Sequence, residues 1–273
     1  MNNIIVGFDF SAGSAIAVDL AIDIANRWQN DIRLVYVKTS ANEDEGKIRE
    51  EIERRNAAVE SLLKGIKLEY VLRVGKVSHE LVEQAKEDNA SLVIVGTNGM
   101  SGYKKNWIGR NTYATITESH VPVLCIREGF NFNKALEDIL VPLDSTLSTR
   151  QKVPVAAKFA AAFGSKIHIL ALYSSSSNSS VRGIVNNYVL QVDKFLYSKG
   201  IQHDIERKDV DNKNVTDVIL KRADEINADM IVIMTEQESA ISEWLLGSTA
   251  EQMLHLSTRP VLSIRPEDEA LGR

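Results

Sequence analysis

The chain has 273 residues, of which 44% are hydrophobic and 25% charged, a composition typical of a globular protein with room for two domains. The formal net charge of −5 argues against nucleic acid as a partner, and the single cysteine excludes a disulfide framework or a cysteine-rich metal site. The chain shows neither a secretion signal nor a run of membrane-spanning length, so we expect no membrane partner and a cytoplasmic location.

The first half of the chain alternates short apolar runs with amphipathic stretches. The apolar runs predict buried strands at residues 4–8, 32–37, 68–74, 92–95 and 121–126. Helical spacing predicts helices at residues 15–28, 47–63, 78–86 and 111–119, the third with Ser78 as its N-cap. Strands that alternate with helices predict a parallel sheet covered by helices on both faces.

The second half of the chain repeats the first. Residues 4–9 recur at 139–144, residues 92–95 at 230–233, and residues 122–127 at 260–265. The offsets are 139 − 4 = 135, 230 − 92 = 138 and 260 − 122 = 138, so one domain is written twice. We therefore predict two tandem α/β domains, residues 1–130 and 137–267, with a linker near 129–134 and a serine-rich loop at 174–180.

The loop after the fourth predicted strand is the strongest candidate for a ligand site. Gly96 and Gly99 are followed, after nine more residues, by Gly109 at the start of a helix. Glycines let backbone N–H groups turn toward a ligand, and a helix N-terminus favours an anion. Ligands of open parallel sheets bind at the carboxyl ends of strands, where Asp9 follows the first strand. These features predict a polar, phosphate-bearing ligand, although ordinary turns also explain such glycines.

Asp9, the spacing Gly96-x2-Gly99-x9-Gly109 and the last strand at 121–124 resemble the universal stress protein family, and the resemblance covers both halves. It implies a five-stranded parallel sheet of order 3-2-1-4-5 in each domain. It also implies that the two last strands pair into an intramolecular pseudo-dimer, and it leaves open a homodimer of whole chains. The implied cofactor of the first domain is ATP, with or without Mg²⁺. The residues implied to bind it are Asp9, Val37, Gly96, Gly99, Gly109, Arg110, Asn111 and Thr112.

Arg110 departs from the family pattern, which has Ser or Thr directly after the third glycine. Its guanidinium either binds phosphate as a charged fork or fills the site and abolishes binding. Asn111 and Thr112 follow at positions that allow them to supply polar contacts instead.

The second domain carries a degenerate version of the loop. Met234 and Gln237 replace the first two glycines, and nearby glutamates add negative charge that repels a triphosphate. Asp144 matches Asp9. Gly247 is followed by Ser and Thr at the start of a helix, but a tight turn with an N-cap explains these three residues without any ligand. We expect this site to hold no nucleotide.

The sequence contains no pattern that predicts efficient catalysis. The histidines lack metal-ligand spacing and there is no nucleophile elbow, so we expect no catalytic residue, no metal ligand and at most slow ATP hydrolysis. Cys125 lies in an apolar run and is expected to be a buried small hydrophobe.

Two functions remain in view. The first is an adenine-nucleotide-binding stress-response protein that acts on an unidentified protein partner. The alternative is a ligand-free protein-interaction module whose two sites are vestigial. An adenylate-forming enzyme would need a Ser-Gly-Gly-x-Asp-Ser loop, which residues 11–16 lack.

Overall fold

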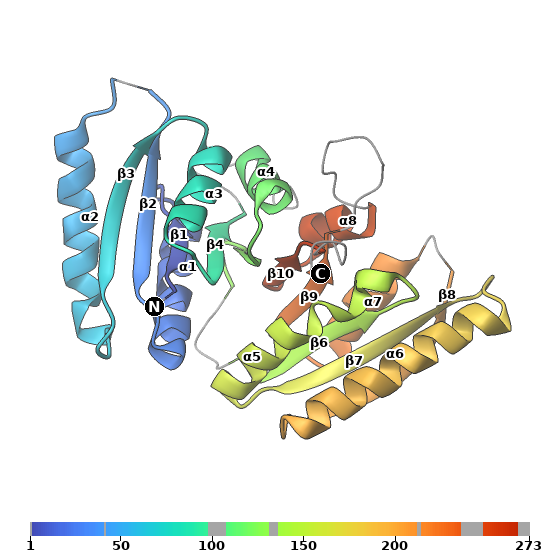
Figure 1. Cartoon of the computed structure of the whole chain (residues 1–273). Helices are drawn as coiled ribbons and strands as arrows, with labels where there is room; N and C mark the ends of the chain where they lie inside the picture. The colour runs from blue at the N-terminus through green and yellow to red at the C-terminus, as the bar shows by residue number, and fades with distance from the viewer. Residues whose placement is uncertain are drawn as a thin grey trace. The chain divides into compact units, whose positions relative to one another are not determined.

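The computed structural model describes residues 2–40, 42–97, 108–130, 136–211, 214–235 and 248–266. Contacts within the chain divide it into two compact units, residues 1–130 and 131–273, here called unit one and unit two (Figure 1). None of the helices in the described ranges is both long and apolar enough to cross a membrane.

Unit one is a parallel sheet with helices on both faces. Its strands run in the order β3-β2-β1-β4-β5, which confirms the predicted order. The helix α1 packs on β1 and β4, whereas α3 packs on β1 and β2 and also against α4. The strands are β1 (Ile4–Gly7), β2 (Ile32–Lys38), β3 (Leu68–Val74), β4 (Leu92–Gly96) and β5 (Val123–Ile126), and the helices are α1 (Ala12–Trp28), α2 (Glu45–Val59), α3 (Val77–Glu87) and α4 (Arg110–Glu118).

Unit two repeats this arrangement, with the order β8-β7-β6-β9-β10. The helices α5 and α6 pack on β6 and β7, and α7 packs against α8. The strands are β6 (Asp138–Leu143), β7 (Lys166–Ser174), β8 (His203–Val210), β9 (Met230–Met234) and β10 (Val261–Ile264), and the helices are α5 (Val153–Phe163), α6 (Ser179–Ser198), α7 (Val215–Glu225) and α8 (Ser248–Leu256).

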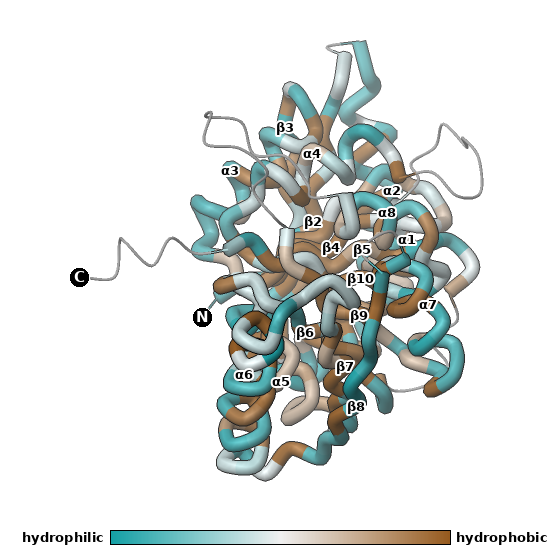
Figure 2. Tube along the Cα trace, turned by 90° about the vertical axis from the view of Figure 1, so that its right-hand side faces the viewer, coloured by the Kyte–Doolittle hydropathy of each residue, from teal (hydrophilic) through white to brown (hydrophobic). Residues whose placement is uncertain are grey.

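Burial explains why the strands are apolar along their whole length. Ile4, Ile5 and Val6 of β1 are each 0% exposed, because β1 is paired on both edges and helices cover both faces. The edge strand β8 is hydrophilic instead, as Figure 2 shows by its teal colour. Charged side chains on an edge strand discourage pairing with other chains.

Two local predictions are wrong. Ser78 is not an N-cap: α3 begins one residue earlier, and the buried Ser78 hydroxyl donates to Glu118 Oε1 at 3.5 Å. The segment 174–180 is not all loop, because α6 begins at Ser179 and Asn178 caps it by accepting a hydrogen bond from the N–H of Val181. Most of the predicted linker lies outside the described residues.

Candidate functional site

The turn after β1 holds Asp9 in a defined orientation. Its Oδ1 accepts hydrogen bonds from the N–H of Ser11 at 3.1 Å and from the Ser11 hydroxyl at 2.5 Å. The Asp9 N–H donates to the Ser14 hydroxyl at 3.4 Å. None of the hydrogen bonds between described residues uses the second oxygen, Oδ2, so it can accept a hydrogen bond from a ligand hydroxyl or amino group.

Unit two builds the same turn around Asp144. Its Oδ1 accepts from the N–H of Thr146 at 2.8 Å and from the Thr146 hydroxyl at 2.6 Å. The Asp144 N–H donates to the Thr149 hydroxyl at 3.2 Å. The offsets, 144 − 9, 146 − 11 and 149 − 14, all equal 135, so the two turns correspond residue by residue.

Two glycines of the predicted site, Gly96 and Gly109, are required by close backbone contacts. A Cβ on Gly96 would lie 3.0 Å from the carbonyl carbon of Gly13 in α1, and a Cβ on Gly109 would lie 3.1 Å from the carbonyl oxygen of Thr97. The Gly109 N–H donates to that same oxygen at 2.8 Å, and Thr112 donates its hydroxyl to the Gly96 carbonyl at 2.8 Å. These bonds join the end of β4 to the start of α4. Gly99 lies outside the described residues.

The start of α4 presents polar groups to solvent. Gly109 is the N-cap residue and makes no side-chain capping bond, so the first N–H groups of the helix can meet an anion. Arg110 and Asn111 are exposed in this first turn, whereas Thr112 is buried. The structure therefore brings Gly96, Gly109 and Thr112 together by contact and places Arg110 and Asn111 beside them.

Val37 lies near the end of β2, which pairs with β1, the strand that precedes the Asp9 turn. Its neighbour Tyr36 contacts Phe10 with 5.1 Å between ring centroids and donates its hydroxyl to Glu43 at 2.9 Å. Burial, the hydrogen bond to Glu43 and the negative charges of Glu43 and Asp9 raise the pKa of Tyr36 to about 12. This aromatic pair could not be predicted from the sequence, because its partners are distant along the chain.

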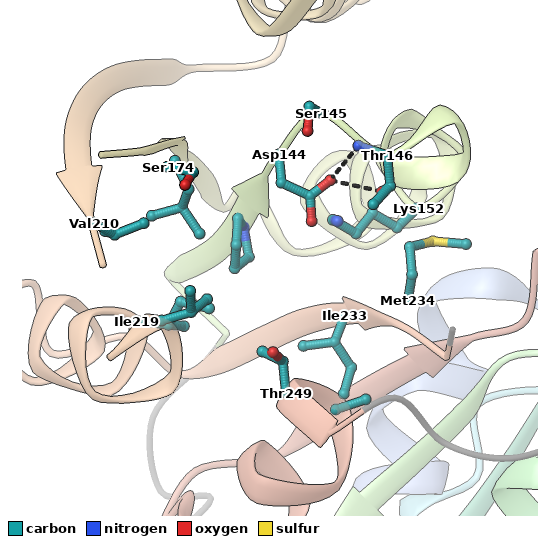
Figure 3. A pocket seen from close by; sticks show the side chains of 14 residues that line it. Asp144, Ser145, Thr146, Lys152, Ser174, Val210, Ile219, Ile233, Met234 and Thr249 are labelled. Atoms are coloured by element: carbon teal, nitrogen blue, oxygen red, sulfur yellow. Dashed lines mark hydrogen bonds between the residues drawn. The ribbon is translucent and has the colours of Figure 1, made fainter. Parts of the chain in front are cut away.

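The clearest cavity among the described residues lies in unit two and has a volume of about 390 Å³ (Figure 3). It lies at the carboxyl ends of β6, β7, β8 and β9 and is bordered by the beginnings of α7 and α8. Its size falls within the range of small-molecule sites, about 300–1,000 Å³. The lining combines the carboxylate of Asp144 and the ammonium of Lys152 with hydroxyl and aliphatic groups. The apolar part includes Leu172, Val210, Val215, Ile219 and Ile233.

This cavity is the counterpart of the site that the sequence predicts in unit one. Five predicted residues correspond to residues that line it, by 144 − 9 = 135, 172 − 37 = 135, 234 − 96 = 138, 249 − 111 = 138 and 250 − 112 = 138. The pairs are Asp9 with Asp144, Val37 with Leu172, Gly96 with Met234, Asn111 with Thr249 and Thr112 with Ala250.

At the matching positions of unit one, two aliphatic side chains lie close to Gly7. A Cβ on Gly7 would lie 3.2 Å from Leu81 Cδ1 and 3.3 Å from Val95 Cγ1. The corresponding residues of unit two, Pro142 at offset 135 and Ile219 and Ile233 at offset 138, line the cavity instead. Leu81 and Val95 therefore close against β1 in unit one.

Lys152 is a cavity residue that the sequence analysis missed. It is 4% exposed, and its Nζ donates to the Thr149 hydroxyl at 3.2 Å. Figure 3 shows the end of its side chain directed toward the Asp144 carboxylate. The repeat contained a signal for it, since Lys152 stands where unit one has the buried Ala17 (152 − 17 = 135).

Two other expectations concern groups away from this site. Cys125 is confirmed as buried, and burial raises the pKa of its thiol, which keeps it unreactive. The described ranges contain no group of three or more His, Cys, Asp or Glu side chains that could hold a metal ion.

Comparison with known proteins gives consistent matches. The universal stress protein family matches residues 1–127 and again residues 136–265. The universal stress protein YxiE of Bacillus subtilis (strain 168) is 28% identical over 146 residues, which are 46% of this chain and 99% of that protein.

Two solved structures match nearly the whole chain. A functionally unknown protein, PA1789, of Pseudomonas aeruginosa PAO1 is 18% identical with a TM-score of 0.73, covering 97% of this chain and 93% of that one. A universal stress protein of Archaeoglobus fulgidus DSM 4304 is 20% identical with a TM-score of 0.72, covering 97% and 98%. At this level of identity the two structures support the fold.

Proposed function

The chain belongs to the universal stress protein family, and we propose that it is a regulatory stress-response protein that binds an adenine nucleotide. The cavity of unit two carries the proposal, in place of the expectation that this unit holds no nucleotide, because its lining corresponds to five of the residues predicted to bind ATP in unit one. Aliphatic walls suit a nucleobase, and the Asp144 Oδ2 oxygen suits a ribose hydroxyl or an exocyclic amine. A protein partner would recognise the nucleotide-bound protein, and the bound nucleotide would be hydrolysed slowly at most.

In unit one we propose an ATP site built from Asp9, Val37, the glycine loop and the first turn of α4. The Gly96–Thr112 and Gly109–Thr97 hydrogen bonds support it, because they hold the helix start against the end of β4. The N–H groups there and the Arg110 guanidinium would bind phosphate, and Mg²⁺ would be held mainly by the phosphates.

The test is to denature the purified protein and identify released nucleotide by chromatography and mass spectrometry. Where little is retained, calorimetric titration with ATP and Mg²⁺ replaces this measurement. Asp9→Asn and Asp144→Asn form a matched pair, because Asn can still accept the Ser11 or Thr146 hydrogen bonds but loses the second carboxylate oxygen. Each variant should abolish binding in its own unit alone. If neither variant changes binding, or the protein binds no adenine nucleotide, the proposal is wrong.

One observation favours the alternative, a ligand-free interaction module, for unit one alone. Leu81 and Val95 pack against Gly7 where the matching residues of unit two line the cavity. If this packing excludes the nucleobase, Asp9→Asn will leave nucleotide binding unchanged while Asp144→Asn removes it. Arg110→Ser then separates the two explanations: improved ATP binding would assign the blockage to the arginine, and no change would assign it to Leu81 and Val95.

A further inference from the structure

Unit one contains a further cavity, which is lined by residues of α1 and α2 and has a volume of about 310 Å³. Ala15 of α1 and Glu51, Arg54, Arg55 and Ala58 of α2 contribute to the lining. This volume is within the range of small-molecule sites. The described residues that line the cavity include none of those proposed to bind ATP, so it is separate from the proposed nucleotide site.

Part of the lining is aromatic. Phe8, which follows β1, and Phe10 in the next turn contact each other with 5.0 Å between ring centroids and 74° between the rings. Phe10 has a φ of 63°, in the left-handed region that is unfavourable for a bulky side chain. Its counterpart in unit two is Ser145 (145 − 10 = 135), which is not among the described residues with a positive φ. Strain of this kind is often found at binding sites, and a pair of aromatic rings suits a planar ring as the ligand.

Two arginines bring positive charge to the same cavity. Arg55 donates from Nη2 to the Ala15 carbonyl oxygen at 3.2 Å and to the Asp19 carboxylate. Arg54 donates from Nη2 to Glu51. None of the hydrogen bonds between described residues uses Nε or Nη1 of either arginine. Two arginines and one glutamate give the lining a formal charge of 2 − 1 = +1, and planar guanidinium groups with donors to spare suit a carboxylate.

Unit two shows what occupies the corresponding place when no ligand is needed there. Ala15 corresponds to Arg150 (150 − 15 = 135). The Arg150 guanidinium reaches α6, where Nη1 donates to Gln191 and the central carbon lies 4.2 Å from the centroid of the Tyr188 ring. A methyl group at this position in unit one leaves that space open.

We propose that the cavity between α1 and α2 binds a small aromatic carboxylate. The planar ring lies against Phe8 and Phe10, and the carboxylate accepts hydrogen bonds from Arg54 and Arg55. This site goes beyond the proposed nucleotide binding and does not rest on it, because the two cavities share no described residue.

The experiment is an NMR titration of the isotope-labelled full chain with three probes. The first is 2-naphthoate, the second is its uncharged amide, 2-naphthamide, and the third is cyclohexanecarboxylate, which keeps the carboxylate but has no planar ring. Shifts of the amide signals of Ala15 and Ala58 locate the binding event. Circular dichroism verifies that each variant described below is folded.

Two variants test the residues, and each has a matched control. Ala15→Arg copies unit two and should fill the cavity, whereas Ala57→Arg adds the same side chain at an exposed position of α2 that does not line it. Arg55→Gln removes the charge and keeps a donor for the Ala15 carbonyl oxygen. Arg49→Gln removes the same charge from α2 outside the cavity.

We expect 2-naphthoate to bind at least about tenfold more tightly than either of the other probes, as one charge-assisted hydrogen bond allows. Ala15→Arg and Arg55→Gln should each weaken 2-naphthoate binding at least about tenfold, and the two controls should leave it within about twofold. Equal binding of 2-naphthoate and its amide, or no binding that shifts the Ala15 and Ala58 signals, would overturn the proposal and leave the proposed nucleotide function intact. It would also be overturned if Ala15→Arg had no more effect than Ala57→Arg, or if Arg55→Gln weakened the acid and the amide equally, because the arginine would then be structural.

Discussion

Replacing Gly96 by alanine should destabilise unit one. The added Cβ would lie 3.0 Å from the Gly13 carbonyl carbon and 3.3 Å from the Ser14 nitrogen, whereas ordinary van der Waals contact begins at 3.4 Å. The start of α1 must therefore retreat by 3.4 − 3.0 = 0.4 Å, and the obstructing atoms belong to the backbone, which cannot rotate away. Overpacking of this kind costs about 1–3 kcal/mol. Since Ser14 also accepts the Asp9 N–H, nucleotide binding in unit one should weaken as well.

Gly183→Ala in α6 is the matched control. No atom lies within 4 Å of its added Cβ, and the residue is inside a helix, so alanine should stabilise unit two by about 0.5–1 kcal/mol. Scanning calorimetry and urea unfolding of the full chain, followed by circular dichroism, measure both changes. If Gly96→Ala unfolds at the same temperature and urea concentration as the unaltered chain, the packing argument for this glycine is refuted.

Three further predictions concern titratable groups. Cys125 should resist a thiol reagent in the folded protein and react with one equivalent after denaturation, because burial raises the pKa of its thiol; fast reaction of the folded chain would contradict this. Burial raises the pKa of Asp204, but the hydrogen bond from Lys166 and nearby positive charge outweigh it and hold the pKa below its ordinary value. Its stabilising contribution is thus present above about pH 4 and lost as the pH falls below it, so acid unfolding monitored by circular dichroism should begin at lower pH in the unaltered chain than in Asp204→Asn. Burial and Glu43 raise the pKa of Tyr36 to about 12. Tyr36 should therefore stabilise the protein below about pH 10, and this contribution should be lost as the pH approaches 12. Tyr36→Phe should remove one late step from the absorbance titration of the tyrosines.

The architecture could be predicted because several signals in the sequence agree. The repeat set the number of units, and apolar runs such as residues 68–74 located strands correctly. The first and last residues of the helices could be predicted less well, because they depend on capping groups. Ser78 is a residue type that often caps helices, yet the helix begins at Val77, and the Ser78 hydroxyl donates a hydrogen bond to Glu118 instead. That contact joins α3 to α4, and no local rule could anticipate it.

The places of single candidate residues in the fold could be predicted from the sequence, whereas the cavity could not. The turn of Asp9 and its counterpart Asp144 followed from their position after the first strand of each copy. The cavity did not, because it depends on side chains that five or more elements bring together. Lys152 had a readable signal, since it stands directly before the apolar helix α5 at the position where the first copy has Ala17 (152 − 17 = 135). A charged residue at such a position is a stronger indication of a site than the lost glycines are of a vestigial one.

The two candidate functions, nucleotide binding and a ligand-free interaction module, make different predictions for a cavity at the site. A site under no functional constraint can gain stability when larger aliphatic side chains fill it and when a buried charge is replaced by a methyl group. Unit one has taken the second step, with the buried Ala17 at the lysine position. Unit two keeps a cavity of about 390 Å³ that is lined by the buried Lys152. A cavity of this size is expected to persist where a ligand fills it, and we therefore expect the unit with the poorer glycine loop to keep a ligand site.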